Sequence, residues 1–424
     1  MLMVGLAILF FAMIMLSIAL HEIGHLVPAK IFGVRVSQYM VGFGRTLWSR
    51  QRGETEYGIK MIPLGGYVRL IGMYPPERQA TNKGWLERFA DQARSYEYEE
   101  VRPDDQGRLF YEKPWWQKVI VMFGGIGMNL LLAFLIFLGI QVFHGYYQPS
   151  LQVSAVSQCV IPADRTEAGC LESDPPTPAL QAGIKPGDEI VSANGTQVTS
   201  WQQMSELIRA NGDGAMAIQV RRDGQLVELA EVNTVLTGVP DRLDPTTTVE
   251  AGFLGVSPSY ELMHGGPVET VAQMWDMTRM SLVALVNFPV RVYYVLADMV
   301  TGAPRDPNSP ISIVGASIVA GELGAAEDIA VGDRVATWMS LLGSVNLFVA
   351  LLNLVPLLPL DGGHVAGALW EALRRAGARL LRRKDPGPVD TAKMLPVAYI
   401  VGGFLLLGGI VLIVADLISP VSLL

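Results

Sequence analysis

Long apolar segments dominate the pattern of hydrophobic and polar positions along this chain. Four predominantly apolar blocks each reach about 20 residues, the helix length needed to cross a hydrocarbon layer about 30 Å thick. They cover residues 2–20, 119–143, about 336–360 and 396–415. No Lys or Arg precedes Lys30 and no small-residue cleavage pattern precedes the motif that follows the first block, so we interpret this block as a retained span rather than a signal peptide. The pattern predicts a polytopic α-helical membrane protein with about four transmembrane helices.

The charges of the connecting segments indicate the orientation of these helices. Residues 27–117 hold 14 basic and 11 acidic residues, and residues 362–394 hold 7 basic and 3 acidic ones. The long segment 144–335 holds 10 basic and 23 acidic residues. The positive-inside rule therefore places the first two segments in the cytoplasm and the third outside it. The net charge of −8 comes mostly from the acidic segment and offers no basic face for nucleic acid.

The first apolar block leads into a motif of ionisable residues, His21-Glu22-Ile23-Gly24-His25. On a helix His21 and His25 are four positions apart, so both imidazoles project from one face and can hold one Zn²⁺. Glu22 stands beside them and can act as general base toward the attacking water. Ionisable groups at membrane depth are costly unless they function. A chance HExxH sequence is the alternative, which the scarcity of histidine, 5 in 424 residues, disfavours.

A catalytic zinc site usually has three protein ligands, so the two histidines need a third from elsewhere in the chain. Asp361 follows the third apolar block, and the predicted topology brings the ends of the first and third helices to the same cytoplasmic face. His364 is a rival ligand, and a plain turn carboxylate is the alternative for Asp361. Pro356 breaks the helix and Asn353 adds an amide, so both are candidates for holding an extended substrate strand. An interhelical polar contact is the alternative for Asn353.

The extracytoplasmic segment contains a pattern of strands and turns. Residues 178–199 place two glycine turns around a strand, residues 201–209 have a helical pattern, and two further strands flank the Asp223-Gly224 turn. This pattern is similar to a bacterial PDZ domain, a fold that receives extended peptides by strand addition. Residues 252–258 are the candidate for a neighbouring strand.

Two other features of this segment leave alternatives open. Cys159 and Cys170 could form a disulfide outside the cytoplasm, but two free thiols would give the same sequence. Residues 267–301 form an amphipathic to apolar stretch, which fits a membrane-surface or gating element, with a fifth span as the alternative.

Taken together, the motifs resemble the site-2 protease family of intramembrane zinc metalloproteases, in its bacterial, PDZ-containing form similar to the regulator-of-sigma-E protease. HEIGH matches the family's HExxH, residues 353–362 match its Asn-Pro-Leu-Asp-Gly motif, and residues 125–129 match its Gly-x-x-x-Asn element without the usual proline. The resemblance covers nearly the whole chain, and the single PDZ-like pattern is more similar to actinobacterial members. It implies a membrane re-entrant β-hairpin, which residues 57–73 fit, with Gly65 and Gly66 bordering the substrate. A plain cytoplasmic hairpin is the alternative.

The resemblance also implies one Zn²⁺ per chain, held by His21, His25 and Asp361, with Glu22 as the catalytic base. The implied reaction is hydrolysis of a peptide bond inside the bilayer, toward the cytoplasmic side of a bacterial inner membrane. The implied partners are single-pass membrane proteins, such as anti-sigma factors already cut outside by a site-1 protease, or remnant signal peptides. The alternatives are a catalytically silent PDZ adaptor, disfavoured by the general base, and a metal-ion transporter, disfavoured because the polar residues cluster at one depth.

The predicted fold class is a polytopic α-helical membrane protein with a re-entrant β-hairpin and an extracytoplasmic α+β PDZ domain. Its segments are the first helix with HEIGH (1–30), a cytoplasmic segment with the hairpin (31–113), the second helix (114–145), the PDZ domain (146–262), an amphipathic linker (263–334), the third helix with the Asn-Pro-Leu-Asp-Gly motif (335–362), a basic cytoplasmic loop (363–394) and the fourth helix (395–418).

Overall fold

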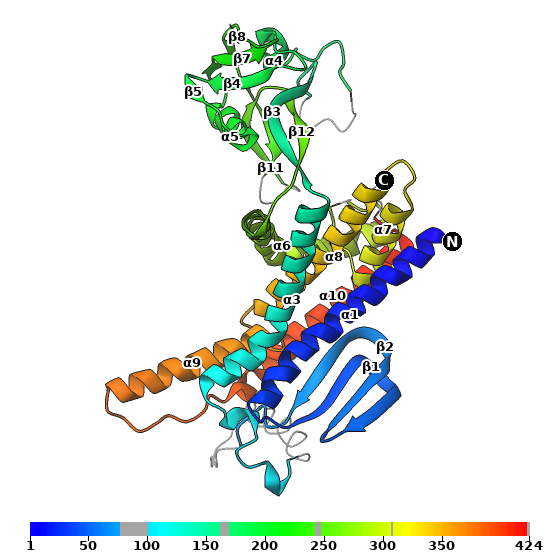
Figure 1. Ribbon diagram of the computed structural model, residues 1–424, viewed down its shortest axis with the longest axis vertical. Coiled ribbons are helices and arrows are strands. Elements are labelled where there is room, and N and C mark those ends of the chain that lie inside the picture. The colour runs from blue at the N-terminus through cyan, green and yellow to red at the C-terminus, as the bar shows by residue number, and fades with distance from the viewer. Residues whose placement is uncertain (77–100, 162–168, 242–246, 307, 422–424) are drawn as a thin grey trace. The chain divides into compact units, whose positions relative to one another are not determined.

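The chain folds into two compact units. The computed structural model describes residues 1–76, 101–161, 169–241, 247–306 and 308–421, so part of the predicted cytoplasmic segment, residues 77–100, lies outside the described residues. One unit contains Met1–Ile140 and Pro267–Leu424, and the other contains Gln141–Gly266. The first unit holds the long helices and the second is rich in sheet (Figure 1).

Helices make up most of the first unit. They are α1 (Leu2–Ile31), α3 (Trp115–Phe143), α6 (Pro267–Thr301), α7 (Ile313–Ala325), α8 (Val331–Leu354), α9 (Asp361–Leu380) and α10 (Leu395–Ile418), with 3-10 helices at Pro103–Asp105, Phe110–Glu112 and Thr391–Met394. Among the described residues, five helices are long and apolar enough to cross a membrane: α1, α3, α6, α8 and α10. Residues 267–301 thus add a candidate to the four expected spans, because they form one continuous helix that is long and apolar enough, as the fifth-span alternative for this stretch requires.

The third predicted helix ends earlier than the sequence suggested. α8 stops at Leu354, residues 355–360 form turns, and Asp361 is the first residue of α9. A Cβ on Gly362 would lie 2.4 Å from the carbonyl oxygen of Leu354, so only glycine lets the start of α9 fold back onto the end of α8. The segment 363–394, predicted as a loop, thus contains most of a helix. The break places Asp361 at a helix N-terminus rather than at the end of a span.

Helices α1 and α3 touch through their backbones. A Cβ on Gly24 would lie 2.3 Å from the carbonyl oxygen of Gly124, and a Cβ on Gly124 would lie 2.0 Å from that of Gly24. No side chain fits between these two backbones, which is the close approach that small residues permit between membrane helices. Because Gly24 belongs to the HEIGH motif, this crossing brings the histidines directly against α3.

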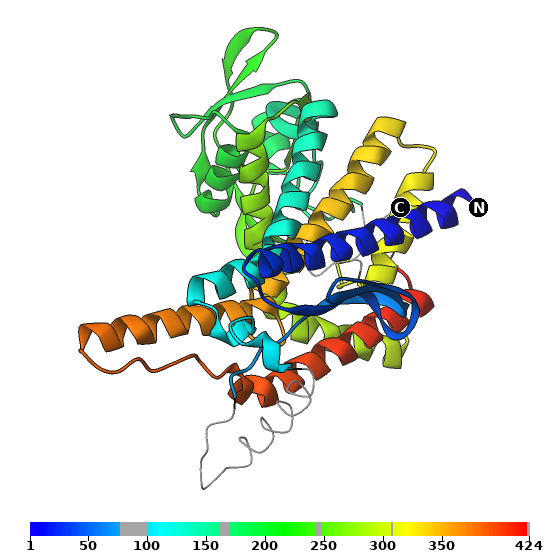
Figure 2. The same cartoon turned by 60° about the horizontal axis from the view of Figure 1, so that its bottom comes forward.

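A β-sheet lies beside α1 (Figures 1 and 2) and consists of β1 (Val36–Arg52) and β2 (Thr55–Leu70). Residues 38–41 of β1 pair with β2 on both sides. Residues 56–59 pair with them on one side, and residues 66–69 pair with them on the other. The chain therefore doubles back between Ile59 and Gly66, within the stretch predicted as a hairpin. The Tyr39 hydroxyl donates to the carbonyl of Ala19 at 2.8 Å and ties the sheet to α1. The sheet is larger than the hairpin predicted over 57–73 because it begins at Val36.

The position of α7 is fixed by a buried ion pair at the end of α10. Arg305 Nη1 donates to Asp416 Oδ1, and Asp416 Oδ2 accepts from the backbone N–H of Ser312 at 2.7 Å. Ser312 in turn caps α7, its hydroxyl accepting from two N–H groups of the first turn. Ala316 and Ala320 of α7 pack on α1, so the ion pair indirectly supports the helix that carries the histidines.

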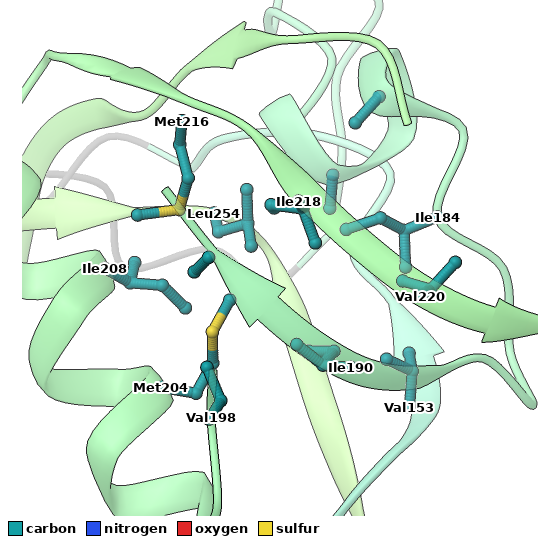
Figure 3. Close-up of a cluster of buried hydrophobic side chains, with 13 residues drawn as sticks. Val153, Ile184, Ile190, Val198, Met204, Ile208, Met216, Ile218, Val220 and Leu254 are labelled. Atoms are coloured by element: carbon teal, nitrogen blue, oxygen red, sulfur yellow. The ribbon is translucent and has the colours of Figure 1, made fainter. Parts of the chain in front are cut away.

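The second unit is a small α+β fold around a six-stranded sheet. Its elements are β3 (Tyr146–Val156), α4 (Pro178–Ala182), β4 (Glu189–Ala193), β5 (Thr196–Gln197), α5 (Trp201–Asn211), β6 (Ala215–Met216), β7 (Ile218–Arg222), β8 (Gln225–Glu228), β9 (Val232–Asn233), β10 (Val235–Pro240), β11 (Thr248–Phe253) and β12 (Val256–Met263). The sheet has the order β12-β3-β4-β7-β8, with β5 paired to β4. Met204 and Ile208 lie one turn apart on α5 and pack against Ile190 and Ile218 (Figure 3).

Several local predictions for this unit are confirmed. The helix expected over 201–209 is α5, and the Asp223-Gly224 turn joins β7 to β8. Cys159 and Cys170 form a disulfide. Residues 252–258 cover the end of β11 and the start of β12, and β12 pairs with β3 as a neighbouring strand.

We expect the second unit to lose stability below about pH 4 through Asp188. Burial by itself would raise the pKa of Asp188, but hydrogen bonds from Arg222 and from the Lys185 amide outweigh it and hold that pKa below its ordinary value of 3.8. Arg222 donates to both carboxylate oxygens at 2.7 Å. A depressed pKa stabilises the folded state above the ordinary value, and this contribution is lost as the pH falls through the folded value. Asp188→Asn should cost about 1.5–3 kcal/mol at neutral pH and flatten the acid dependence.

The measurement is thermal unfolding of the full chain at a series of pH values. Unfolding of the second unit is monitored by fluorine NMR of fluorotryptophan at Trp201, which is the only tryptophan between Gln141 and Gly266. Arg221→Gln is the matched control, because Arg221 makes an exposed ion pair with Glu189. An acid profile that Asp188→Asn leaves unchanged would contradict the assignment.

Candidate metal centre

Three predicted ligands from two distant parts of the chain converge inside the helical unit. His21 and His25 project from the last turns of α1, and Asp361 opens α9. Asp361 Oδ2 lies 3.4 Å from His21 Nε2 and 3.2 Å from His25 Nε2, and the two Nε2 atoms are 3.2 Å apart. Both histidines are buried. His364, the rival ligand, is not part of the ligand cluster that the described residues form.

The hydrogen bonds of His25 decide which ring nitrogen faces the cluster. His25 Nδ1 lies 2.9 Å from the carbonyl oxygen of Val121 on α3. A carbonyl only accepts, so Nδ1 carries the proton. The neutral ring then presents the lone pair of Nε2 toward Asp361, which is the tautomer that a metal ligand requires.

Asn129 on α3 serves His21 in the same way. Its side-chain amide lies 3.2 Å from His21 Nδ1. The amide oxygen of Asn129 is buried without a hydrogen-bond partner when the NH₂ group points to the ring, whereas turning the amide lets this oxygen accept from Nδ1–H. The turned amide satisfies the orphaned oxygen and leaves His21 Nε2 unprotonated. The Nε2 lone pairs of His21 and His25 and the carboxylate of Asp361 then face one another with no proton between them.

This arrangement fits a zinc ion. Ligand atoms around tetrahedral zinc with bonds of about 2.0–2.1 Å are roughly 3.3–3.4 Å apart. The three separations here are 3.2, 3.2 and 3.4 Å. Asp361 Oδ2 is buried and has no hydrogen-bond donor among the described residues, so a cation is the partner that it lacks. His21, His25 and Asp361 would hold the metal through these atoms.

Glu22 lies in the same cavity as the cluster. The cavity has a volume of about 620 Å³. The backbone amide of Val68 on β2 hydrogen-bonds to Glu22, and a Cβ on Gly66 would lie 3.1 Å from Glu22 Cγ. The strand thus packs directly on the carboxylate, and glycine at position 66 leaves room for it.

The other predicted site residues fall in different places. Gly65, Gly66 and Asn353 line the cavity, as does His364. Pro356 is exposed in the turn after α8 and is not among the cavity-lining residues, so the structure does not bring it to the site. Pro359, three residues further along the same turn, lines the cavity instead.

The sequence identified residues 125–129 as a family element but did not predict that this part of α3 contacts the histidines. A Cβ on Gly125 would lie 2.2 Å from His25 Nε2 and 2.8 Å from His21 Cε1, so only glycine allows both rings to reach the cluster. The Gly125-Ile126-Gly127-Met128-Asn129 stretch contained the signal, since an amide and spaced glycines stand inside an apolar helix. Asn346 on α8 is another buried polar residue that lines the cavity.

Comparison with known proteins agrees with this geometry. The model of peptidase family M50 matches residues 9–383. Zinc metalloprotease Rip1 of Mycobacterium tuberculosis is 35% identical, with 98% of each chain covered. Zinc metalloprotease Rip1 of Mycolicibacterium smegmatis is 33% identical over 99% of each chain, and metalloprotease MmpA of Caulobacter vibrioides is 28% identical over 85% of each. The match extends over the apolar helices and the whole ligand cluster, and the chain therefore belongs to peptidase family M50, the site-2 protease family of zinc metalloproteases.

Proposed function

We propose that this protein is a zinc-dependent endopeptidase that cleaves transmembrane segments of single-pass proteins inside the bilayer. The observation that carries the proposal is the cluster of His21, His25 and Asp361, which opens on a cavity within a unit of apolar helices and has Glu22 beside it. A transporter would need polar groups along a path through several helices, whereas Glu22 and the three candidate ligands line one cavity.

The proposed roles follow from the placement of each side chain. A zinc ion held by the three ligands would supply Lewis-acid polarisation of the scissile carbonyl and lower the pKa of water. Glu22 takes a proton from the attacking water and returns it to the leaving amine. Val121 and Asn129 keep the two imidazoles in the tautomer that binds metal. One ion per chain is expected, because one such cluster is found in the part of the chain that the structure describes.

The sheet beside α1 is the proposed guide for the substrate. Gly66, Val68 and Arg69 line the cavity on one side while β1 lies on the other side of the same stretch. A substrate helix must unwind before its peptide carbonyl can be attacked, and an extended segment can add to this strand edge. Asn353, near the end of α8, lines the same cavity and is the proposed partner for the polar groups of such a segment. The bends of the sheet carry exposed apolar side chains, which supports entry into the membrane: Phe43, Leu47, Trp48, Ile59, Met61 and Ile62.

The unit Gln141–Gly266 is proposed to be a PDZ domain on the extracytoplasmic side. The order of its strands and helices, its α5 helix and the disulfide support this assignment. We propose the bacterial inner membrane as location, with the metal centre toward the cytoplasm. Membrane proteins already cut outside by another protease, such as anti-sigma factors or remnant signal peptides, are the proposed substrates. A folded domain outside the membrane favours trimmed chains over intact ones.

The test combines metal removal with two forms of one substrate. The full-length protein in liposomes should cleave a trimmed single-pass substrate, lose this activity to a zinc chelator, and regain it with one equivalent of zinc. An intact substrate with a folded outer domain should be cut at least about tenfold more slowly. Stoichiometric zinc without cleavage of any trimmed substrate would favour the adaptor. Cleavage that persists after complete removal of zinc would exclude the mechanism.

Asn129→Leu should weaken zinc binding about 10–100-fold, because His21 would lose the acceptor that fixes its tautomer. Asn129→Asp keeps an acceptor at the same position and should bind zinc at least as well as Asn129→Gln. Zinc affinity is measured by competition with a coloured chelator. Met128→Leu, the preceding residue on α3, serves as the control. Equal affinity of the wild type and Asn129→Leu would show that the amide does not orient His21.

A further inference from the structure

Helix α9 presents a stripe of large, exposed apolar side chains. Leu369, Leu373 and Leu380 fall on one line of a helix with 3.6 residues per turn, and Trp370 borders it. Leu373 is 64% exposed and Leu380 is 85% exposed. In both views the second half of α9 projects beyond the neighbouring helices (Figures 1 and 2). An exposed apolar stripe of this size marks an interaction surface.

The opposite face of α9 is anchored to the protein. Glu371 is buried and accepts from Lys118 of α3 at 2.8 Å, and Ala368 beside it is also buried. Arg375 pairs with Glu371 as well. The orientation of the helix about its own axis is therefore fixed, and the stripe must face away from the protein.

Basic side chains gather at the exposed end of the same helix. Four of the six residues 379–384 are basic: Arg379, Arg382, Arg383 and Lys384. All four are exposed, and in the described part of the chain none has an acidic partner within ion-pair distance. The other two residues of this run are leucines. A helix with an apolar stripe and Lys or Arg beside it is typical of a segment that lies in a membrane interface.

The neighbouring helix gives the depth of this surface. Trp115 and Trp116 are the first residues of α3, and they line one groove together with Leu373, Ala376 and Arg379. Tryptophan at the end of a span marks the boundary between headgroups and acyl chains. The stripe of α9 therefore lies at the level of the interface, next to where α3 enters the hydrocarbon.

We propose that α9 is an interfacial helix that binds anionic lipid headgroups in the leaflet at which α3 begins. Leu369, Leu373 and Leu380 lie among the upper acyl chains. The cations of residues 379–384 contact the phosphates of the anionic lipids. Zwitterionic lipid offers the acyl chains without the net negative charge, so it holds the helix end less firmly.

The experiment measures the depth of single positions on α9 in the full-length protein. Because Cys159 and Cys170 form a disulfide, a nitroxide reagent labels only a newly introduced cysteine. Leu380→Cys and Ala378→Cys are compared, because side chains two positions apart on a helix point to nearly opposite sides. Each is placed in vesicles of phosphatidylcholine alone or mixed with phosphatidylglycerol. Relaxation by oxygen reports the lipid phase and relaxation by a water-soluble nickel complex reports the aqueous phase.

The expected result is that the label at Leu380→Cys responds to oxygen and the label at Ala378→Cys responds to nickel in the mixed vesicles. The contrast between the two labels, meaning the difference in their oxygen-to-nickel relaxation, should fall at least about threefold in pure phosphatidylcholine. It should fall likewise at high salt, or when the four basic residues are replaced by glutamine. Replacing Arg379, Arg382 and Arg383 by lysine keeps the charge and should keep the contrast. The proposal is overturned if the contrast is the same in both vesicles, if both labels respond to nickel, or if the Leu380→Cys label is shielded from both reagents by protein.

Discussion

Replacing Glu22 by glutamine should leave zinc bound and lower the rate of peptide cleavage about a thousandfold. Glutamine has the shape of glutamate but cannot take a proton from water. The proposed ligand atoms belong to His21, His25 and Asp361, none of which is changed in this variant. Zinc content by atomic absorption and single-turnover cleavage of a trimmed substrate in liposomes measure the two effects on the same preparation.

A carboxylate elsewhere in the same unit provides the control. Glu56 on β2 accepts a hydrogen bond from Gln38 and lies outside the cavity-lining set, so Glu56→Gln should cleave at a rate close to that of the wild type. Glu22→Asp keeps the carboxylate but shortens the side chain by one methylene, so it should give an intermediate rate of cleavage. Full activity in Glu22→Gln would remove Glu22 from the mechanism, and loss of zinc in that variant would make it a ligand rather than a base.

Replacing Gly125 by alanine should abolish zinc binding and, with it, cleavage. The new methyl group would lie 2.2 Å from His25 Nε2 and 2.8 Å from His21 Cε1, which is well inside van der Waals contact. Neither ring can move away freely, because His25 is hydrogen-bonded to Val121 and His21 to Asn129. We expect zinc occupancy below about a tenth and a rate below about one hundredth of wild type, since a displaced ligand costs several kcal/mol.

Gly127→Ala is the matched control, because it changes the same helix two residues away. Its nearest neighbours would be Phe123 ring carbons at 3.8 Å, which is ordinary contact, so zinc and activity should be retained. Gel filtration distinguishes a lost metal site from a lost fold, and Gly125→Ala should elute as the wild type does. Stoichiometric zinc in Gly125→Ala would mean that the histidines do not lie against α3.

The helix break after α8 and the sheet beside α1 show where prediction from the sequence stopped. Pro356 predicted a break in the third apolar run but not that a new helix begins at Asp361. α8 ends at Leu354, and Gly362 lets α9 fold back on its last carbonyls. The strand from Val36 was missed because its pairing with residues 66–70 joins segments about 30 residues apart. Residues 267–301 mix polar and apolar positions, so their helical length became clear only in the fold.

The sequence by itself determined the parts of this protein whose physics is local. An apolar run of spanning length predicts a membrane helix. Two histidines four residues apart share one helix face, and a carboxylate after a broken apolar helix is a candidate third ligand. The tertiary structure alone decided how these parts become a metal centre. The crossing of α1 and α3 at Gly24 and Gly124 brings Val121, Gly125 and Asn129 onto the two imidazoles, some 100 residues away along the chain. Such contacts depend on how closely two backbones approach, which only the packed helices define.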